Sequence, residues 1–439
     1  MWPAPFYWYF IMIMFLIFAG VLLVLLIGVT TAVTMGFVSL ATFLMAGGAM
    51  DKLFLIPQRM YDQVSGITLM AIPFFLLMGN LMNVGGVSGS LFGFGRACLG
   101  HRWGGLSNAA IAACMVMAAM SGSAAACAAG IGMIAIGEMS KCGYDKSFSC
   151  ATIAAGGALG PVIPPSITLI LFAGLTNTSV GQLFAAGIIP GVLLGVGFML
   201  WSSFVSKKNN YAKVDPVPWI ERFDAFKKAF LALMTPVIVL GGMFGGFFTA
   251  TEAAAVASFY VMILGFFVLK TIHLKDMPKI FWDTVEQTAK VMFIIATAAF
   301  FQYVLIYTRI PAQAIAFISD SFSSIVPVLL IIIVVLILMG CFMEGTAILL
   351  ITVPIFVPLA KAFHYDIIQL GIVMCISLAI GVLTPPVGLN LYVMASITGD
   401  KVMKIAKHAV GYVLIMFLFA ILTAFCSPVT LYLASFVKS

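Results

Sequence analysis

Two segments of the sequence end in a pair of prolines and could create binding sites for charged ligands. They are Gly160-Pro161-Val162-Ile163-Pro164-Pro165 and Gly381-Val382-Leu383-Thr384-Pro385-Pro386. Proline lacks an amide proton and disfavours helical geometry in the residue before it, so each pair breaks its helix or, in the alternative interpretation, only kinks it. A break frees the carbonyls of residues 160–163 and 381–384 as ligands for a hard cation such as sodium. The amino-terminal ends of half-helices can face an anion.

A stretch of small residues from Met120 to Ala126 contains two hydroxyl groups, at Ser121 and Ser123. Small side chains let backbones approach closely, so the stretch suits the tip of a re-entrant hairpin. Small residues also serve ordinary helix packing in membranes, which is the alternative interpretation.

Glu344 is an ionisable residue within an apolar part of the chain. Placing a charge there costs at least about 2.5 kcal/mol on insertion scales, which favours a functional role. The carboxylate could bind substrate hydroxyls or a cation, or it could cap the following helix. Glu252 follows Thr249 by three residues, the spacing of a capped first helical turn, so we predict a structural role for it. Glu138, near Lys141 at a helix end, is expected at the membrane interface.

These residues must be held by membrane helices. Of the 439 residues, 63% are hydrophobic and only 8% are charged, whereas about 25% are charged in soluble domains. Runs of about 20 apolar residues, each long enough to cross the bilayer, recur along the chain and are apolar all round. We therefore expect an all-α polytopic membrane protein with about eleven to thirteen spans plus re-entrant pieces. The first span, from Phe6 to Gly28, is expected to remain in place because it lacks the features of a removed signal peptide.

The formal net charge of +7 reflects basic residues scattered through short loops rather than a nucleic-acid-binding surface, and no nucleic-acid partner is expected. The densest group lies in the longest polar connection, from Ser206 to Lys228, which the positive-inside rule places in the cytoplasm. The eight cysteines show neither metal-ligand spacing nor a disulfide framework and are expected to pack in apolar segments.

The chain contains an internal repeat with an offset of 221 residues. Residues 158–165, ALGPVIPP, match residues 379–386, AIGVLTPP, and Tyr144-Asp145 matches Tyr365-Asp366 in the same register. The offset also places Glu344 on Ser123. Each half therefore contains a stretch of small or polar residues, a helix, a Tyr-Asp loop, a helix and a Pro-Pro break, as expected for a transporter built from paired repeats.

In these segments the sequence closely resembles the large membrane subunit (M subunit) of tripartite ATP-independent periplasmic (TRAP) transporters. The segments that resemble the family span nearly the whole chain in order: residues 72–82 (IPFFLLMGNLM), 121–124 (SGSA), 160–166 (GPVIPPS), 248–255 (FTATEAAA) and 383–390 (LTPPVGLN). The resemblance implies an elevator-type transporter with a scaffold and a moving domain, built from inverted repeats with two re-entrant helical hairpins and broken helices.

The resemblance also implies where ligands bind. Sodium ions, co-transported, would lie near the hairpin tips and breaks, at Ser121, Gly122, Gly160, Gly345, Thr346, Gly381 and Thr384. The substrate anion would lie between them, near Ser123, Ser166, Thr168 and Glu344. Two departures leave the substrate open among dicarboxylates, sugar acids such as sialic acid, keto acids and small sulfonates: many relatives have Asp in place of Cys127, and Asp in place of Glu344.

Four regions follow from this organisation: N-terminal scaffold helices in residues 1–65, the first repeat in 66–205, the basic connection and central scaffold helices in 206–310, and the second repeat in 311–439. In the family, the large subunit works with a small four-helix membrane subunit (Q-type) and a periplasmic substrate-binding protein (P-type). The resemblance therefore implies a bacterial inner-membrane location, surrounded by lipid.

The function we expect is import of a small organic anion by the permease subunit of a sodium-coupled secondary transporter. A passive anion channel is one alternative, and sodium-dependent uptake would distinguish the two. An intramembrane enzyme is a weaker alternative, because His101, His273, His364 and His408 are dispersed and show no paired catalytic or metal-ligand spacing. The sequence contains no ATP-binding loop, so an ion gradient or a partner must supply the energy.

Overall fold

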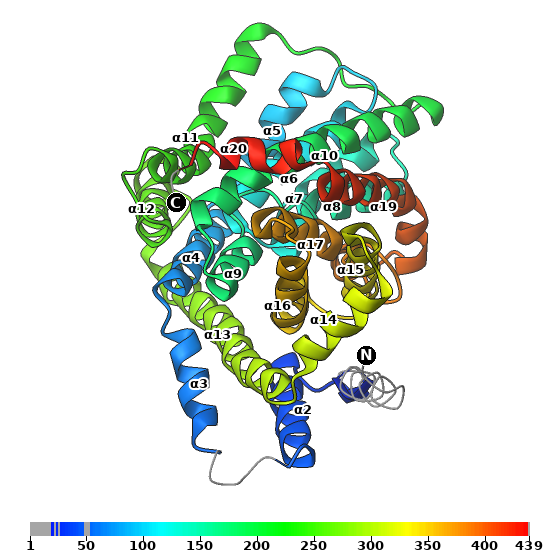
Figure 1. The fold of residues 1–439 in the computed structure, drawn as a ribbon. Coiled ribbons are helices and arrows are strands. Elements are labelled where there is room, and N and C mark those ends of the chain that lie inside the picture. Colours follow the sequence, from blue (N-terminus) through cyan, green and yellow to red (C-terminus); the bar gives the residue numbers. More distant parts are fainter. Residues whose placement is uncertain (1–18, 22, 25–26, 48–52, 438–439) are drawn as a thin grey trace.

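The structure, a computed structural model, describes residues 19–437 except residues 22, 25–26 and 48–52. Most of the predicted first span lies outside the described residues. The described chain consists of helices and connections and contains no β-strand, which confirms the all-α prediction (Figure 1).

The described helices fall into two groups along the chain. The first comprises α2 (Thr31–Met45), α3 (Leu55–Val64), α4 (Ala71–Val84), α5 (Val87–Leu99), α6 (Gly105–Ser121), α7 (Ala124–Lys141), α8 (Lys146–Gly157), α9 (Ile167–Thr176) and α10 (Val180–Lys208). The second comprises α11 (Trp219–Phe244), α12 (Ala250–Ile263), α13 (Met277–Tyr307), α14 (Ile310–Ser321), α15 (Ile325–Gly340), α16 (Gly345–Ala362), α17 (Ile367–Gly381), α18 (Leu389–Thr398), α19 (Val402–Phe425) and α20 (Ser427–Ala434).

Six helical stretches of the described chain are long and apolar enough to cross a membrane. They are Ile67–Val84, Val180–Lys208, Ala250–Val268, Leu274–Tyr307, Gly345–Ala362 and Val402–Phe425. Further apolar helices of 10–17 residues, such as α9 and α18, are too short to span about 30 Å at 1.5 Å per residue. Large apolar side chains such as Leu200, Phe259 and Leu414 remain more than half exposed on the long spans, as expected for a surface that faces lipid.

The 221-residue offset predicted from the sequence is confirmed by the helix boundaries. Adding 221 to the bounds of α7 gives the bounds of α16, and α8 and α17 start at equivalent residues. The correspondence extends further than the sequence match: α9 falls on α18, α10 on α19, and α2 on α12, within a few residues. The residues from α3 to α4 fall on the single helix α13. The four-region division of the chain stays a prediction, and equivalent helices also lie outside its two repeat ranges.

Equivalent local signals start equivalent helices. The side chain of Asp145 accepts a hydrogen bond from the backbone nitrogen of Phe148 (2.8 Å) at the start of α8. Asp366 accepts one from Gln369 (2.9 Å) at the start of α17. Such caps satisfy amide groups that a helix leaves unpaired at its amino terminus. The structural role predicted for Glu252 is also confirmed, because it forms a capping box with Thr249 at the start of α12.

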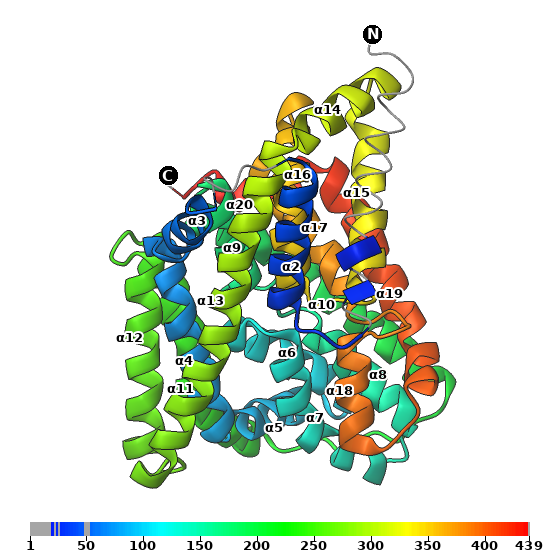
Figure 2. The same cartoon turned by 90° about the horizontal axis from the view of Figure 1, so that it is seen from below.

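The helices form two groups. The outer group comprises α2, α3, α4, α11, α12 and α13, and the inner group comprises the helices next to the hairpin tips and breaks, α6 to α9 and α15 to α18. In the outer group, α13 packs against α2, α3 and α4, while α12 packs against α4 and α11. Figure 2 shows α4, α11, α12 and α13 along one flank of the molecule, with α15, α18 and α19 towards the other. The relation of α2 to α13 repeats that of α12 to α4, as the internal offset requires.

The two repeats interlock through the short helices that follow the breaks. Helix α18 packs on α7 and α8 of the first repeat, and α9 packs on α16 and α17 of the second. Asn390 at the start of α18 donates a hydrogen bond to the carbonyl of Ala154 (2.9 Å). At the other end, the hydroxyl of Ser147 donates a hydrogen bond to Asp400, which lowers the pKa of that carboxyl group. The inner helices of both repeats thus form one packed body.

Helices α15 and α17 make an unusually close approach at a pair of glycines. A Cβ atom added to Gly381 would lie 2.4 Å from the Cα atom of Gly340, and a Cβ atom added to Gly340 would lie 2.8 Å from the Cα atom of Gly381. No side chain fits at such distances. The carboxyl-terminal end of α15, the first helix of the second hairpin, therefore contacts the start of the second Pro-Pro break directly. Small residues permit such contacts between membrane helices.

We expect Gly381→Ala to destabilise the protein by about 1–3 kcal/mol, the usual cost of inserting atoms into a packed core. The matched control is Gly137→Ala on α7, where an added Cβ atom meets nothing within 4 Å. Thermal unfolding of the two purified variants in sodium-free detergent solution measures the difference. Equal melting temperatures would contradict the close packing of α15 on α17.

Candidate functional site

A cavity of about 380 Å³ lies where the two repeats meet the outer helices. Six of the residues predicted to bind ligands line it: Gly122, Ser123, Thr168, Glu344, Gly345 and Thr346. These residues come from both repeats and are brought together from positions more than 200 residues apart. The remaining lining residues are Leu76, Ala124, Ala125, Ala126, Pro161, Ile167, Gln287, Lys290, Val291, Leu378, Val382 and Leu389.

Four helix amino termini converge on this cavity. The first residues of α7, α9, α16 and α18, which are Ala124, Ile167, Gly345 and Leu389, all belong to its lining. Each amino terminus has a partial charge of about +0.5 and unpaired amide groups. Four of them create a positive field, which a carboxylate at Glu344 would offset only in part. The cavity is therefore suited to an anion.

The helix starts of the two repeats differ in how their amide groups are satisfied. In the first repeat, Ser123 accepts a hydrogen bond from Ala126 (3.4 Å) and Ser166 accepts one from Leu169 (3.5 Å). In the second, Glu344 and Gly388 occupy the equivalent cap positions, and neither makes a side-chain cap hydrogen bond. At the start of α18 the amides of Asn390 and Leu391 donate to the carbonyls of Val382 (3.1 Å) and Gly388 (2.8 Å), whereas the first amides of α16 are left for another acceptor.

Glu344 lies at the cap position of α16 without acting as its cap. Its side chain is exposed and belongs to the cavity lining, so its carboxylate oxygens can accept hydrogen bonds from a molecule in the cavity. This geometry favours the ligand-binding interpretation of the residue over the capping interpretation.

The predicted cation ligands of the first repeat lie close to one another at the tip of the first hairpin. A Cβ atom added to Gly160 would lie 2.9 Å from the backbone nitrogen of Ala124, so the break rests on the hairpin tip. Gly122 has a φ of +58° and turns the chain between α6 and α7, close to the amide of Ile167. The hydroxyl of Ser121 donates to the carbonyl of Met117 (3.0 Å) and accepts from the backbone nitrogen of Ser123 (3.5 Å), which leaves one lone pair for a cation.

Ser166 was predicted to lie near the anion, but the structure places it behind the lining. Its side chain is fully buried, and its hydroxyl donates a hydrogen bond to the carbonyl of Pro161 (2.9 Å). Together with its cap of α9, this bond holds the start of α9 against the break. Thr168, two residues later, does reach the cavity.

The second repeat places its predicted cation ligands in a similar arrangement. Gly345 lies beside Leu378 of α17, and Thr346 follows it in the cavity lining. The hydroxyl of Thr384 donates to the carbonyl of Ile380 (2.8 Å), like Ser121 in the first repeat. Gly381 and Thr384 do not line the cavity. The described residues contain no cluster of three or more His, Cys, Asp or Glu side chains for a metal, so a cation would depend largely on backbone and hydroxyl oxygens.

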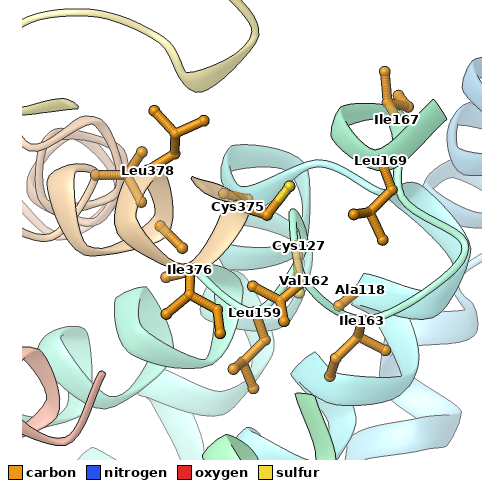
Figure 3. Close-up of a cluster of buried hydrophobic side chains, with 14 of the residues drawn as sticks. Ala118, Cys127, Leu159, Val162, Ile163, Ile167, Leu169, Cys375, Ile376 and Leu378 are labelled. Atoms are coloured by element: carbon orange, nitrogen blue, oxygen red, sulfur yellow. The ribbon is translucent and has the colours of Figure 1, made fainter. Parts of the chain in front are cut away.

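An apolar core supports the first break. Figure 3 shows Leu159, Val162 and Ile163 among side chains from α6, α7, α9 and α17. Cys127 is fully buried there, and its thiol donates a hydrogen bond to the carbonyl of Cys114 (3.2 Å). The cysteine thus packs in the core, as the sequence predicted for this residue.

Four lining residues from the outer helices were not predicted from the sequence. Leu76 belongs to α4, and Gln287, Lys290 and Val291 belong to α13. Helix α13 lies in residues 206–310, which were predicted to be connection and scaffold, and no sequence motif indicated a ligand-binding role for it. The one available signal was the spacing of Gln287, Lys290 and Val291, which places polar and charged groups on one helical face.

Comparison with known proteins now identifies the family. The family model described as "Tripartite ATP-independent periplasmic transporter, DctM component" matches residues 18–429. The chain belongs to this family. The prediction of a TRAP large permease subunit is thereby confirmed.

Curated relatives are similar over most of their length. A C4-dicarboxylate TRAP transporter large permease from Pseudomonas aeruginosa is 40% identical over 373 residues, covering 85% of this chain and 87% of that protein. A sialic acid TRAP large permease from Vibrio cholerae is 38% identical and covers 78% and 80%. An isethionate TRAP permease, DctMQ, from Oleidesulfovibrio alaskensis is 34% identical and covers 94% and 65%. These relatives are named as permeases, so the chain is a transporter component and not an enzyme.

One solved structure shows a similar fold. The crystal structure of the YdaH transporter from Alcanivorax borkumensis matches with a TM-score of 0.60, covering 86% of this chain and 89% of that chain. The sequence identity is 14%, so the likeness concerns the fold alone. It supports the all-helical fold.

We expect Glu344→Gln to insert normally but to weaken anion transport. The substitution keeps the size of the side chain and removes its charge, and hydrogen bonds to charged groups contribute about 1.5–3 kcal/mol, or roughly 10- to 100-fold in kcat/KM. The matched control is Glu252→Gln, which retains a capping box and lies away from the cavity. Uptake by protein of equal expression gives the comparison. Unchanged affinity, rate and sodium dependence in the Glu344 variant would refute a role in substrate handling.

Proposed function

We propose that this chain is the permease subunit through which a small organic anion crosses the bacterial inner membrane in a sodium-coupled TRAP transporter. The observation on which this proposal depends is the convergence of four helix amino termini on one cavity that also contains Glu344, Ser123 and Thr168. An anion that enters the cavity meets amide donors at the start of α16 that no side chain caps.

The substrate we propose has a carboxylate or sulfonate group. The relatives are named for C4-dicarboxylate, sialic acid and isethionate, and these molecules share an anionic group despite different sizes. Sialic acid and isethionate also contain hydroxyl groups, which can donate hydrogen bonds to the carboxylate of Glu344. The volume of about 380 Å³ accommodates small molecules of this kind.

Sodium is the coupling ion in this proposal. Each hairpin tip packs close to a broken helix, and backbone carbonyls with the hydroxyls of Ser121, Thr346 and Thr384 offer hard oxygen ligands without a cluster of carboxylates. A sodium ion near either tip would also offset the repulsion between Glu344 and an incoming anion. Binding of the two ions would thus be coupled.

The transport movement we propose is of the elevator type. The inner helices of both repeats interlock through α9 and α18 and form one packed body, whereas α13 and α4 contribute side chains to the opposite wall of the cavity. A body of this kind can carry its bound anion past the outer helices as a unit. Two partners complete the proposed system: a small four-helix membrane subunit, and a periplasmic protein that captures the anion and delivers it.

We expect Thr384→Ala and Ser121→Ala to raise the sodium concentration needed for half-maximal uptake by about threefold to tenfold, the factor for roughly 1 kcal/mol. Each substitution removes one oxygen near a break and little volume. The matched control is Ser39→Ala on α2, whose buried hydroxyl makes the same type of bond to the carbonyl four residues earlier but lies far from both breaks in the sequence. An unchanged sodium response in both test variants would indicate that the breaks do not bind sodium.

Reconstitution tests the proposed function as a whole. We expect proteoliposomes that contain the chain and its small subunit to accumulate radiolabelled succinate, sialic acid or isethionate only with an inward sodium gradient and the cognate binding protein. Vesicles with equal sodium on both sides are the control. Rapid uptake of the free anions without sodium or binding protein would support the passive channel instead.

A further inference from the structure

Lys290 contributes the one basic side chain to the described lining of the cavity. It lies on α13, and the rest of that helix, from Val291 to Tyr307, contains no charged residue. Its neighbours on the same face, Gln287 and Val291, also line the cavity. A cation at the point where the charged part of α13 ends is costly to keep in lipid, and its place in the cavity lining favours a functional role.

The ammonium group of Lys290 is paired only weakly. Its Nζ atom lies 2.6 Å from the Oε1 atom of Glu286, one helical turn earlier, and 68% of the lysine side chain and 50% of the glutamate side chain remain exposed. Exposed ion pairs between residues four apart are weak and readily exchanged. Glu286 does not belong to the cavity lining. The lysine can therefore leave Glu286 for an anion in the cavity while it stays within the same helical turn.

The internal repeat shows that this charge exists on one wall only. The residue equivalent to Lys290 by the 221-residue offset is Leu69, which is buried beside α4. The equivalent position in the first repeat is therefore apolar and lies outside the cavity lining, so the basic side chain of the described lining comes from α13 alone. Glu344 on the inner body belongs to the same cavity, so the two charges define a polar axis across it.

We propose that Lys290 binds the anionic group of the transported molecule, exchanging its ion pair with Glu286 for one with the substrate carboxylate or sulfonate. The substrate then lies between a cation on the outer helix α13 and the helix amino termini and Glu344 of the inner body. Lys290 belongs to the outer group. It therefore selects for anions in the conformation that the structure shows, and its contact with the substrate is lost once the inner body moves. This role rests on the proposed function, since it assumes an anionic substrate.

Equilibrium binding to the purified complex of the chain with its small subunit tests the role. The probes are succinate, sialic acid and isethionate in sodium-containing solution, and the apparent dissociation constant comes from the shift of melting temperature with probe concentration. We expect Lys290→Gln to weaken binding of the best probe at least tenfold, and Lys290→Arg to restore it to within about threefold. The control Lys279→Gln, an exposed lysine of the same helix outside the cavity lining, should bind like the unmodified protein.

Glu286→Gln separates a binding role from a structural one. It frees Lys290 from its competitor, so we expect binding to become about twofold tighter, the opposite direction to Lys290→Gln. If the ion pair only stabilised α13, both variants would change binding in the same direction. That result, or a Lys290→Gln variant that binds as well as Lys279→Gln, would overturn the proposal.

Chemical labelling of the unmodified complex gives an answer even if a variant fails to fold. Saturating probe should lower acetylation of Lys290 by acetic anhydride several-fold and leave Lys279 unchanged, as measured by mass spectrometry of the digested protein. Equal labelling of Lys290 with and without a bound probe would refute the contact. If the unmodified complex binds none of the three probes, the proposed substrate class itself is wrong, which is distinct from a failure confined to Lys290.

Discussion

A broken helix inside a membrane leaves backbone amide and carbonyl groups that lipid cannot satisfy, and this constraint determines the rest of the structure. Protein must cover each break. The first break is covered by its own hairpin tip, where Gly160 lies against Ala124, and the second by the end of α15, where Gly381 lies against Gly340. The short helices beyond the breaks are covered by the opposite repeat. Interlocking of the repeats is thus a consequence of breaking the helices.

The same constraint gives the cavity its charge. Because each break and each hairpin tip begins a new helix at membrane depth, amino termini that would otherwise lie at the interface point into the protein. Serine side chains cap them in the first repeat. In the second, backbone carbonyls accept from the first amides of α18, whereas Glu344 makes no side-chain cap at the start of α16. The duplicated architecture is therefore symmetric in its helices and asymmetric in its chemistry. A single asymmetric anion is better matched by such a site than by two identical half-sites.

The sequence predicted those features that depend on local chemistry. The Pro-Pro breaks, the Tyr-Asp connections before α8 and α17 and the helix-start role of Glu252 depend on residues a few positions apart, and the structure contains all of them. The equivalence of α2 and α12 was not apparent because it depends on helix placement and not on matching residues. Nor could the sequence show that the Ser166 hydroxyl turns to Pro161, or that Lys290 faces the cavity, because both depend on which surfaces of distant helices meet.

In the proposed mechanism, the inner body and the outer helices contribute different groups to the cavity, and these groups have different roles in transport. Amide groups, hydroxyls and Glu344 belong to the inner body, so they would stay with the substrate throughout an elevator movement and would contribute equally in both end states. Groups that bind equally in two states cannot shift the equilibrium between them. Side chains of the outer helices, such as Gln287 and Lys290 on α13, meet the substrate from outside that body. In this mechanism, state-dependent affinity arises from these outer side chains.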